Sequence, residues 1–302
     1  MKYNNLRKKY HKLCNFEIIV KLGIQTFILL LAVGCSQIGS PPDDDRLVIA
    51  TSIFPVYDMV HNITGDSVEV IYIIPPGANP HIFEPSPDEV IVLSRVDIYL
   101  GIDPDFDGWV EQFLPSHVEN FYLSDSCLDV DAHRNPHIWL SLNHARTIVI
   151  FVEKIVSEKD SMRKYFYQGN LQEYLSEIED LNNQAELLFT DIENNKFIQW
   201  HPAWDYLASD YNLKIIGTIE SGHGDQPSIS QMEDLIEQAK ENQVKLVVIG
   251  LNMENPVAQT LADEIGGRLI RLDAIGDPED EQRSTYLKTM KFNLTTLYEA
   301  LK

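Results

Sequence analysis

Three histidines and one aspartate stand where their side chains could bind a metal ion. His81 lies in the proline-rich segment "PPGANPHIFEPSPDEV" (75–90), His137 in "NPHIW" and His201 in "HPAW", while Asp273 ends the apolar run "RLIRLD". Neutral imidazole nitrogens are good ligands for zinc, and one carboxylate completes a tetrahedral set. Four protein ligands close the coordination shell, which favours storage or transport over catalysis, because a catalytic zinc keeps a position open for water.

The segment around His81 is stiffened to an unusual degree. Its prolines are Pro75, Pro76, Pro80, Pro85 and Pro87. They limit the freedom of the backbone, so less entropy is lost when His81 is fixed on a metal. The alternative for any single loop histidine is a solvated or hydrogen-bonded side chain, and four others are assigned to it: His61, His117, His133 and His144. His223, close to Asp225, is a candidate auxiliary contact, and Glu84 is expected to brace the His81 loop.

Apolar runs typical of strands alternate with helical patterns along most of the chain. We expect strands at 47–52, 68–74, 97–102, 121–123, 196–200, 213–219, 244–250 and 268–273, and helices at 56–63, 87–95, 108–114, 143–157, 203–209, 228–241, 256–265 and 279–301. A longer polar helix is expected over 162–194. Strand–helix alternation predicts parallel sheets with helices on their faces. The predicted fold class is therefore α/β, with two β/α lobes (47–160 and 195–302) joined by one rigid connecting helix (161–194).

The candidate ligands share a place in this predicted architecture. His81 follows the strand 68–74, His201 follows 196–200, and Asp273 closes 268–273, while His137 precedes the helix that starts near 143. Ligands of open α/β sheets bind beyond the carboxyl ends of the strands. Two candidates come from each lobe, so the four would meet in a cleft between the lobes if those edges face each other.

The N-terminus predicts export from the cytoplasm. Residues 1–34 carry six basic residues and one acidic residue, and 22–34 are uncharged. That run is too short for a comfortable membrane span of about 20 residues, and it is typical of a secretory signal peptide. Small residues precede Cys35, as in bacterial lipoprotein signals, so Cys35 is the predicted lipidation site and 35–46 the tether. An uncleaved anchor is the alternative. Either way the body would lie outside the cytoplasm, on the outer face of the membrane or in the periplasm.

Charge and cysteine content narrow the classes of partner. Without the leader the chain holds 18 basic and 45 acidic residues, a surface that repels nucleic acid and suits cationic ligands. With Cys14 in the leader and Cys35 lipidated, Cys127 has no disulfide partner, and it is expected to be a small buried residue.

From Leu47 onward the chain resembles the metal-binding extracytoplasmic receptors of ABC importers for zinc and manganese. The matching stretches are "TSIFPVYDMVHNITGD" (51–66), "PPGANPHIFEPSPDEV" (75–90), "NPHIWLS" (135–141), "HPAWDYLASDYNLKIIG" (201–217), "QPSISQMEDLI" (226–236) and "RLDAIGD" (271–277). The resemblance implies two lobes tied by a long helix, and it maps the ligands onto His81, His137, His201 and Asp273. Manganese receptors tend to carry Glu at the third position, so His201 favours zinc, because imidazole suits zinc and carboxylates suit manganese.

These observations predict a non-enzymatic, lipid-anchored, monomeric receptor that binds Zn²⁺, with Mn²⁺ possible, and passes it to an ABC permease. The long helix implies a small closure rather than a wide hinge motion. The nearest alternative is a manganese or iron receptor of the same family. A secreted zinc hydrolase, with Asp273 or Glu84 as base, and a metal-containing adhesin are the others. The sequence has no HExxH pair, which weighs against the hydrolase.

Overall fold

The computed structural model describes residues 46–128, 135–220, 227–253 and 255–302, with the backbone alone for His81. Residues 46–302 belong to one compact unit. The predicted signal peptide, Cys35, His133 and His223 lie outside the described residues. Among the described helices, none combines the length and the apolar character that crossing a bilayer requires.

The first half of this unit is built on a four-stranded parallel sheet. The strands are β1 (Val48–Thr51), β2 (Glu69–Tyr72), β3 (Ile98–Gly101) and β4 (Glu119–Tyr122), in the order β2-β1-β3-β4. Its connections hold α2 (Phe54–Thr64), α3 (Pro87–Val92) and α4 (Pro104–Asp107). Ser86 and Glu89 form a reciprocal capping box that starts α3 just beyond the His81 loop. We call this half the N-lobe.

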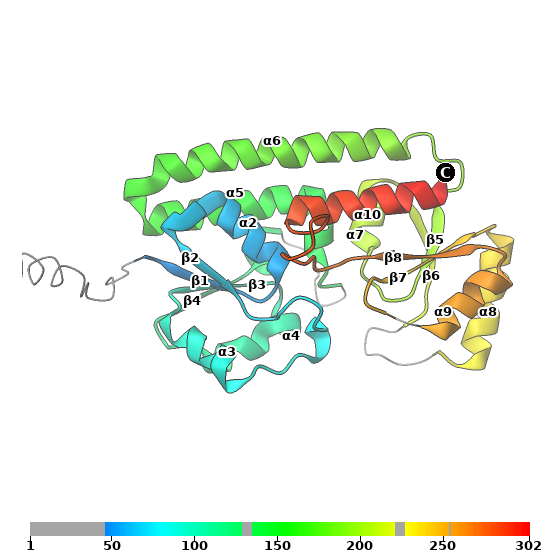
Figure 1. Ribbon diagram of the computed structural model, residues 1–302, viewed down its shortest axis with the longest axis horizontal. Helices are drawn as coiled ribbons and strands as arrows, with labels where there is room; N and C mark the ends of the chain where they lie inside the picture. The colour runs from blue at the N-terminus through cyan, green and yellow to red at the C-terminus, as the bar shows by residue number, and fades with distance from the viewer. Residues whose placement is uncertain (1–45, 129–134, 221–226, 254) are drawn as a thin grey trace, which may run out of the picture. The chain divides into compact units, whose positions relative to one another are not determined.

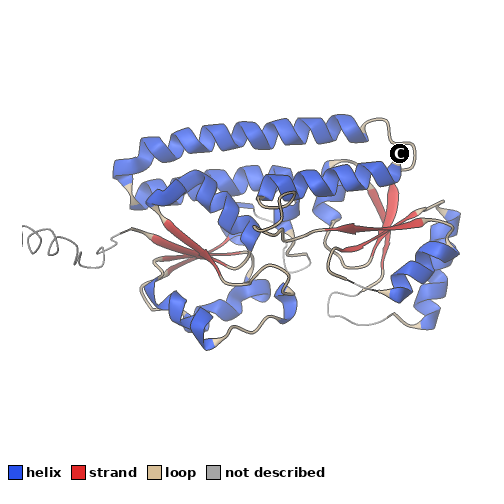
Figure 2. Cartoon of the chain, in the orientation of Figure 1, coloured by secondary structure: helices blue, strands red, loops and turns tan. Residues whose placement is uncertain are grey.

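The second half, the C-lobe, repeats the arrangement. Its strands are β5 (Lys196–Gln199), β6 (Lys214–Thr218), β7 (Leu246–Gly250) and β8 (Arg268–Leu272), all parallel in the order β6-β5-β7-β8. Its helices are α7 (Asp205–Asp210), α8 (Ile229–Glu241) and α9 (Pro256–Glu264). Figure 2 shows the two sheets as two separate groups of strands.

Three long helices pack together in this unit. They are α5 (Leu142–Lys159), α6 (Lys164–Phe189) and α10 (Tyr286–Leu301). Figure 1 shows α6 lying along α5 and then alongside α10, and α6 also packs on α2. The helix that leaves the N-lobe is therefore packed along much of its length rather than spanning solvent.

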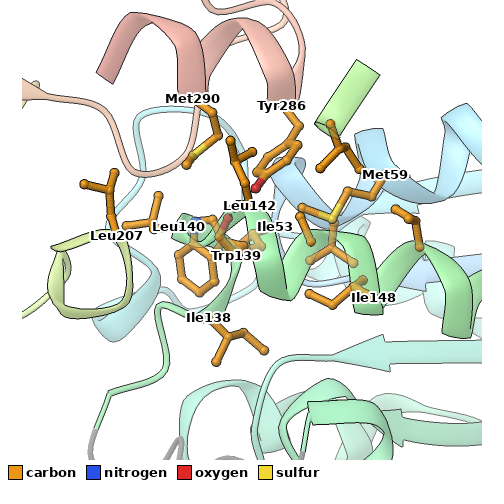
Figure 3. Close-up of a cluster of buried hydrophobic side chains, with 14 of the residues drawn as sticks. Ile53, Met59, Ile138, Trp139, Leu140, Leu142, Ile148, Leu207, Tyr286 and Met290 are labelled. Atoms are coloured by element: carbon orange, nitrogen blue, oxygen red, sulfur yellow. Dashed lines mark hydrogen bonds between the residues drawn. The ribbon is translucent and has the colours of Figure 1, made fainter. Parts of the chain in front are cut away.

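One continuous cluster of buried apolar side chains reaches from one sheet to the other. Ile49 and Leu100 from the N-lobe sheet, and Val248 and Leu272 from the C-lobe sheet, all belong to it. Figure 3 shows its middle, where side chains from several helices surround Trp139; those labelled are Ile53, Met59, Ile138, Leu140, Leu142, Ile148, Leu207, Tyr286 and Met290. A shared core of this kind resists large relative movement of the lobes, because opening it would expose apolar surface.

Buried polar bonds also tie α10 to the N-lobe. Asp58 of α2 accepts hydrogen bonds from the backbone N–H of Tyr286 at 2.9 Å and from the Tyr174 hydroxyl at 3.5 Å. The Tyr286 hydroxyl donates to the carbonyl oxygen of Trp139 at 2.8 Å. Asp58 thus caps the N-terminus of α10, where the helix dipole favours a negative charge.

The predicted fold class is confirmed, with differences at several helix boundaries. The predicted helix 108–114 is a 3₁₀ helix over Gly108–Phe113 that follows the short α4. The long helix covers 26 residues rather than the predicted 33: a separate 3₁₀ turn over Ser161–Arg163, capped by Asp160, precedes it, and it ends at Phe189. The last helix begins at Tyr286 rather than near 279. Upstream of it, the carboxylates of Asp277 and Asp280 accept hydrogen bonds from nearby backbone N–H groups, and such local bonds compete with helix formation.

Two buried carboxyl groups make stability depend on pH. Burial raises the pKa of Asp58 to about 6, although the bond from Tyr286 acts in the opposite direction, and burial likewise raises the pKa of Asp107 to about 6. Both folded-state pKa values lie above that of an unfolded aspartate, about 3.9. The folded protein therefore holds protons that the unfolded chain releases, and this stabilisation is lost as the pH rises through 6.

We predict that Asp58→Asn reduces this pH dependence, because the amide resembles the protonated acid and still accepts the Tyr286 N–H. The parent should lose about 1 kcal/mol more of its unfolding free energy than the variant between pH 5 and pH 7.5. Urea unfolding at both pH values measures the difference, with Asp180→Asn, an exposed change on α6, as the control. Equal pH dependence in parent and Asp58→Asn would contradict the prediction.

Candidate metal site between the lobes

His137 and His201 come together from different lobes. Their ring centroids are 5.0 Å apart and the ring planes are nearly perpendicular, at 84°. His137 precedes the short 3₁₀ turn Ile138–Leu140 that leads into α5, and His201 follows β5. The structure thus brings together two of the four predicted ligands, at the edge of the C-lobe sheet where the strands end.

The His137 ring is held from two sides. Its Nδ1 lies 2.8 Å from Oδ1 of Asn135, which also accepts the His137 backbone N–H at 3.0 Å. On the other side, the Trp139 indole ring lies 5.2 Å from the imidazole. Since the Asn135 oxygen can only accept, Nδ1 carries the proton in this contact and the ring lone pair lies on Nε2.

The support for His137 reaches into the C-lobe. The amide nitrogen of Asn135 donates to Oδ2 of Asp205, at 2.9 Å, and the Trp139 indole N–H donates to the carbonyl oxygen of Ala274, at 2.6 Å. Asp205 also accepts from Gln199 at the end of β5, at 3.1 Å. The position of His137 is therefore coupled to the strand that carries His201.

The His201 ring is enclosed and neutral at ordinary pH. Its Nε2 is shielded from solvent, and Nδ1 lies 3.6 Å from Oε2 of Glu220. Burial lowers the pKa of His201 more than the Asp205 carboxylate raises it. A neutral imidazole can offer a lone pair to a metal without first losing a proton.

Asp273 is buried where β8 ends, and its carboxylate already has partners. Oδ1 accepts the backbone N–H groups of Ile275 and Gly276, each at 3.0 Å, while Oδ2 pairs with the Arg283 guanidinium. The Asn293 side chain on α10 accepts a hydrogen bond from the Asp273 backbone N–H at 2.8 Å and donates one to the Asp273 carbonyl oxygen at 2.6 Å. The strand ends at Leu272, so Asp273 is the first residue after it.

Among the side chains that the structure describes, no three His, Cys, Asp or Glu residues lie close enough together to hold a metal. The backbone of His81 lies in the 3₁₀ turn Pro80–Ile82, and its imidazole is outside the described atoms. The ring of His144, which was expected to be solvated or hydrogen-bonded, lies 4.8 Å from the Tyr206 ring between centroids, and its Nδ1 contacts the Ile138 carbonyl oxygen. Sequence reasoning did not single out Asn135, Glu220 or Arg283.

Comparison with known proteins decides the family. The family described as "Zinc-uptake complex component A periplasmic" matches residues 49–300. The chain belongs to this family. It is 27% identical to the high-affinity zinc uptake system protein ZnuA of Bacillus subtilis, over 91% of this chain and 94% of that protein. It is 26% identical to a metal ABC transporter substrate-binding lipoprotein of Lactococcus lactis, over 91% and 96% of the two chains.

Solved structures of the family agree with the fold. A crystal structure of ZnuA, 27% identical, covers 85% of this chain and 100% of its own with a TM-score of 0.75. A mutant laminin-binding adhesin from Streptococcus agalactiae, 25% identical, covers the same shares with a TM-score of 0.76. Two α/β lobes with a long helix are therefore a property that this chain shares with its relatives.

We predict that Asn135→Ala weakens zinc binding on the order of 10-fold, because the His137 ring loses the oxygen that fixes its orientation. Asn143→Ala is the matched control, since the Asn143 amide also bonds across the lobes, to Asp210 at 2.9 Å, but no bond between Asn143 and His137 is described. Calorimetric titration with Zn²⁺ measures both variants. The interpretation fails if the two substitutions weaken zinc binding equally.

Proposed function

We propose that the protein is an extracytoplasmic receptor that binds Zn²⁺ with high affinity and delivers it to the permease of an ABC importer. The observation that carries this proposal is the pairing of His137 and His201 across the lobes, with Nδ1 of each ring facing an oxygen of its own lobe. With Nδ1 of each ring turned toward these oxygens, we propose that Nε2 is the atom of each ring that binds the ion. The family and the names of the relatives support the same function.

The proposed ligands are His81, His137, His201 and Asp273. His81 would enter from the N-lobe on its proline-rich loop, within the 3₁₀ turn Pro80–Ile82. Asp273 would bind through a remaining lone pair while keeping its present hydrogen bonds, because a carboxylate offers about four acceptor positions. Ligating carboxylates are commonly held by such bonds, which fix their direction.

Zinc is proposed over manganese because imidazole dominates the donor set. Three histidines and one carboxylate match the preference of Zn²⁺ for tetrahedral nitrogen-rich sites, whereas Mn²⁺ favours more oxygen ligands. A manganese or iron receptor of the same family is the nearest alternative. We propose that the protein binds and releases the ion without turnover, as expected of a transport receptor.

We also propose that 1–34 are removed as a signal peptide, that Cys35 carries the lipid, and that 35–46 tether a monomeric body to the outer face of the membrane. Relatives from Lactococcus lactis and Streptococcus pneumoniae are named lipoproteins, which supports this location.

The proposed lobe boundaries remain 47–160 and 195–302, joined by the connecting segment 161–194. A second candidate function, adhesion, is favoured by the solved relative titled a laminin-binding adhesin.

We predict that the metal-stripped protein binds one Zn²⁺ and that Zn²⁺ displaces Mn²⁺. His201→Glu should weaken zinc binding at least 10-fold and narrow the preference over manganese, because it replaces an imidazole by a carboxylate. Competitive titration with both metals measures this. His117→Glu, the same substitution at an exposed position, is the control. Tighter binding of Mn²⁺ by the parent would favour the manganese receptor, and an unreleasable metal with laminin binding would favour the adhesin.

We predict that Cys35→Ala moves the protein from the membrane fraction to the aqueous phase, because it removes the acyl chains that hold a lipoprotein in the bilayer. Detergent phase partition of cells that express the full-length chain measures the distribution. Zinc binding by the released protein should equal that of the parent. Retention of Cys35→Ala in the membrane would instead support an uncleaved N-terminal anchor.

A further inference from the structure

Glu220 is a partly buried carboxylate at the proposed site with no role in the donor set predicted from the sequence. Its side chain is 13% exposed and that of His201 is 20% exposed, with 3.6 Å between Oε2 and Nδ1. Adding this residue to the site changes its charge, because the one carboxylate predicted there, Asp273, is paired with Arg283.

The sheet itself places Glu220 beside His201. Strands β5 and β6 are parallel and pair Gln199 with Thr218, and the ladder continues past their ends. The backbone N–H of Ile219 donates to the carbonyl oxygen of Gln199 at 3.1 Å, and that of Glu220 to Trp200 at 2.7 Å. His201 follows Trp200 in the chain. The backbones of Glu220 and His201 are therefore held close together by strand pairing.

The geometry of imidazole decides what Glu220 can do there. Nδ1 and Nε2 point away from opposite sides of the ring, so a carboxylate at Nδ1 is on the wrong side to share a metal bound at Nε2. Nδ1 of His137 lies within hydrogen-bond distance of the Asn135 oxygen, at 2.8 Å, whereas Nδ1 of His201 lies 3.6 Å from the Glu220 carboxylate. A histidine that binds a metal commonly donates its other ring N–H to a carboxylate or carbonyl oxygen, which fixes the tautomer and makes the ligand more basic.

We propose that Glu220 is the positioning residue of His201, which holds the proton on Nδ1, presents Nε2 to the metal and supplies the negative charge that retains a dication. This inference rests on the proposed function and adds that the two histidines are oriented by different partners. His137 is oriented by a neutral amide and His201 by a carboxylate. The carboxylate makes His201 the more strongly donating of the two rings.

The test compares Glu220→Ala, which removes both orientation and charge, with Glu220→Gln, which keeps an oxygen acceptor. Zinc affinity should fall about 10- to 100-fold in Glu220→Ala and only a few-fold in Glu220→Gln. Glu233→Gln, an exposed charge change on α8, is the control and should leave affinity unchanged. Melting temperatures of the metal-free proteins show whether each variant folds.

A second readout follows the imidazole nitrogens by ¹⁵N NMR. In the metal-free parent, His201 should carry its proton on Nδ1, Glu220→Ala should shift the population toward the Nε2–H tautomer, and Glu220→Gln should restore it in part. Added Zn²⁺ should move the Nε2 resonance of His201. Because the tautomer is measured without metal, it tests Glu220 even if the parent binds no zinc, a result that would overturn the proposed function instead.

Two results would overturn the inference. One is a Glu220→Ala variant that keeps both the parent's zinc affinity and the Nδ1–H tautomer. The other is a zinc-dependent shift at Nδ1 of His201 in the parent, which would place the ion between Nδ1 and the Glu220 carboxylate. Glu220 would then be a direct ligand and not a positioning residue.

Discussion

The site depends on holding two imidazoles from different lobes 5.0 Å apart. His201 belongs to the C-lobe, and the residues around His137 reach that lobe through the bond from Asn135 to Asp205. The lobes are in turn fixed by a shared apolar core and by buried bonds such as those from Trp139 to Ala274 and from Tyr286 to Asp58. Precision at the proposed metal site is therefore a consequence of packing that extends well beyond it, which is typical of preorganised binding sites.

The electrostatics of the site differ from those of the protein surface. The surface carries a large excess of negative charge, which attracts cations in general and selects none. Inside, Arg283 balances Asp273, whereas two carboxylates stand near His201: Glu220 at Nδ1, and Asp205, which raises the His201 pKa. In the proposed site, selectivity would come from the nitrogen donors, and these carboxylates would help to retain the ion without touching it.

Much of the fold follows from the sequence, because alternating apolar strands and amphipathic helices predict parallel sheets directly. The rule that ligands gather at the carboxyl ends of strands predicts His201 and Asp273 as ligands, and each lies just after a strand. Glu220 also lies just after a strand, β6, but it was not predicted because the prediction relied on histidines. Arg283 could not be predicted, since its pairing with Asp273 depends on the turns that delay α10 to Tyr286. Contacts of this kind are decided by tertiary packing.

Diffraction from crystals grown with Zn²⁺, recorded on both sides of the zinc absorption edge, would locate the ion relative to the two imidazoles. We expect one anomalous peak between the lobes, about 2.0–2.1 Å from Nε2 of both His137 and His201, with Asn135 and Glu220 still behind the two Nδ1 atoms. A peak that contacts only one of these rings, or one at the protein surface, would contradict this expectation.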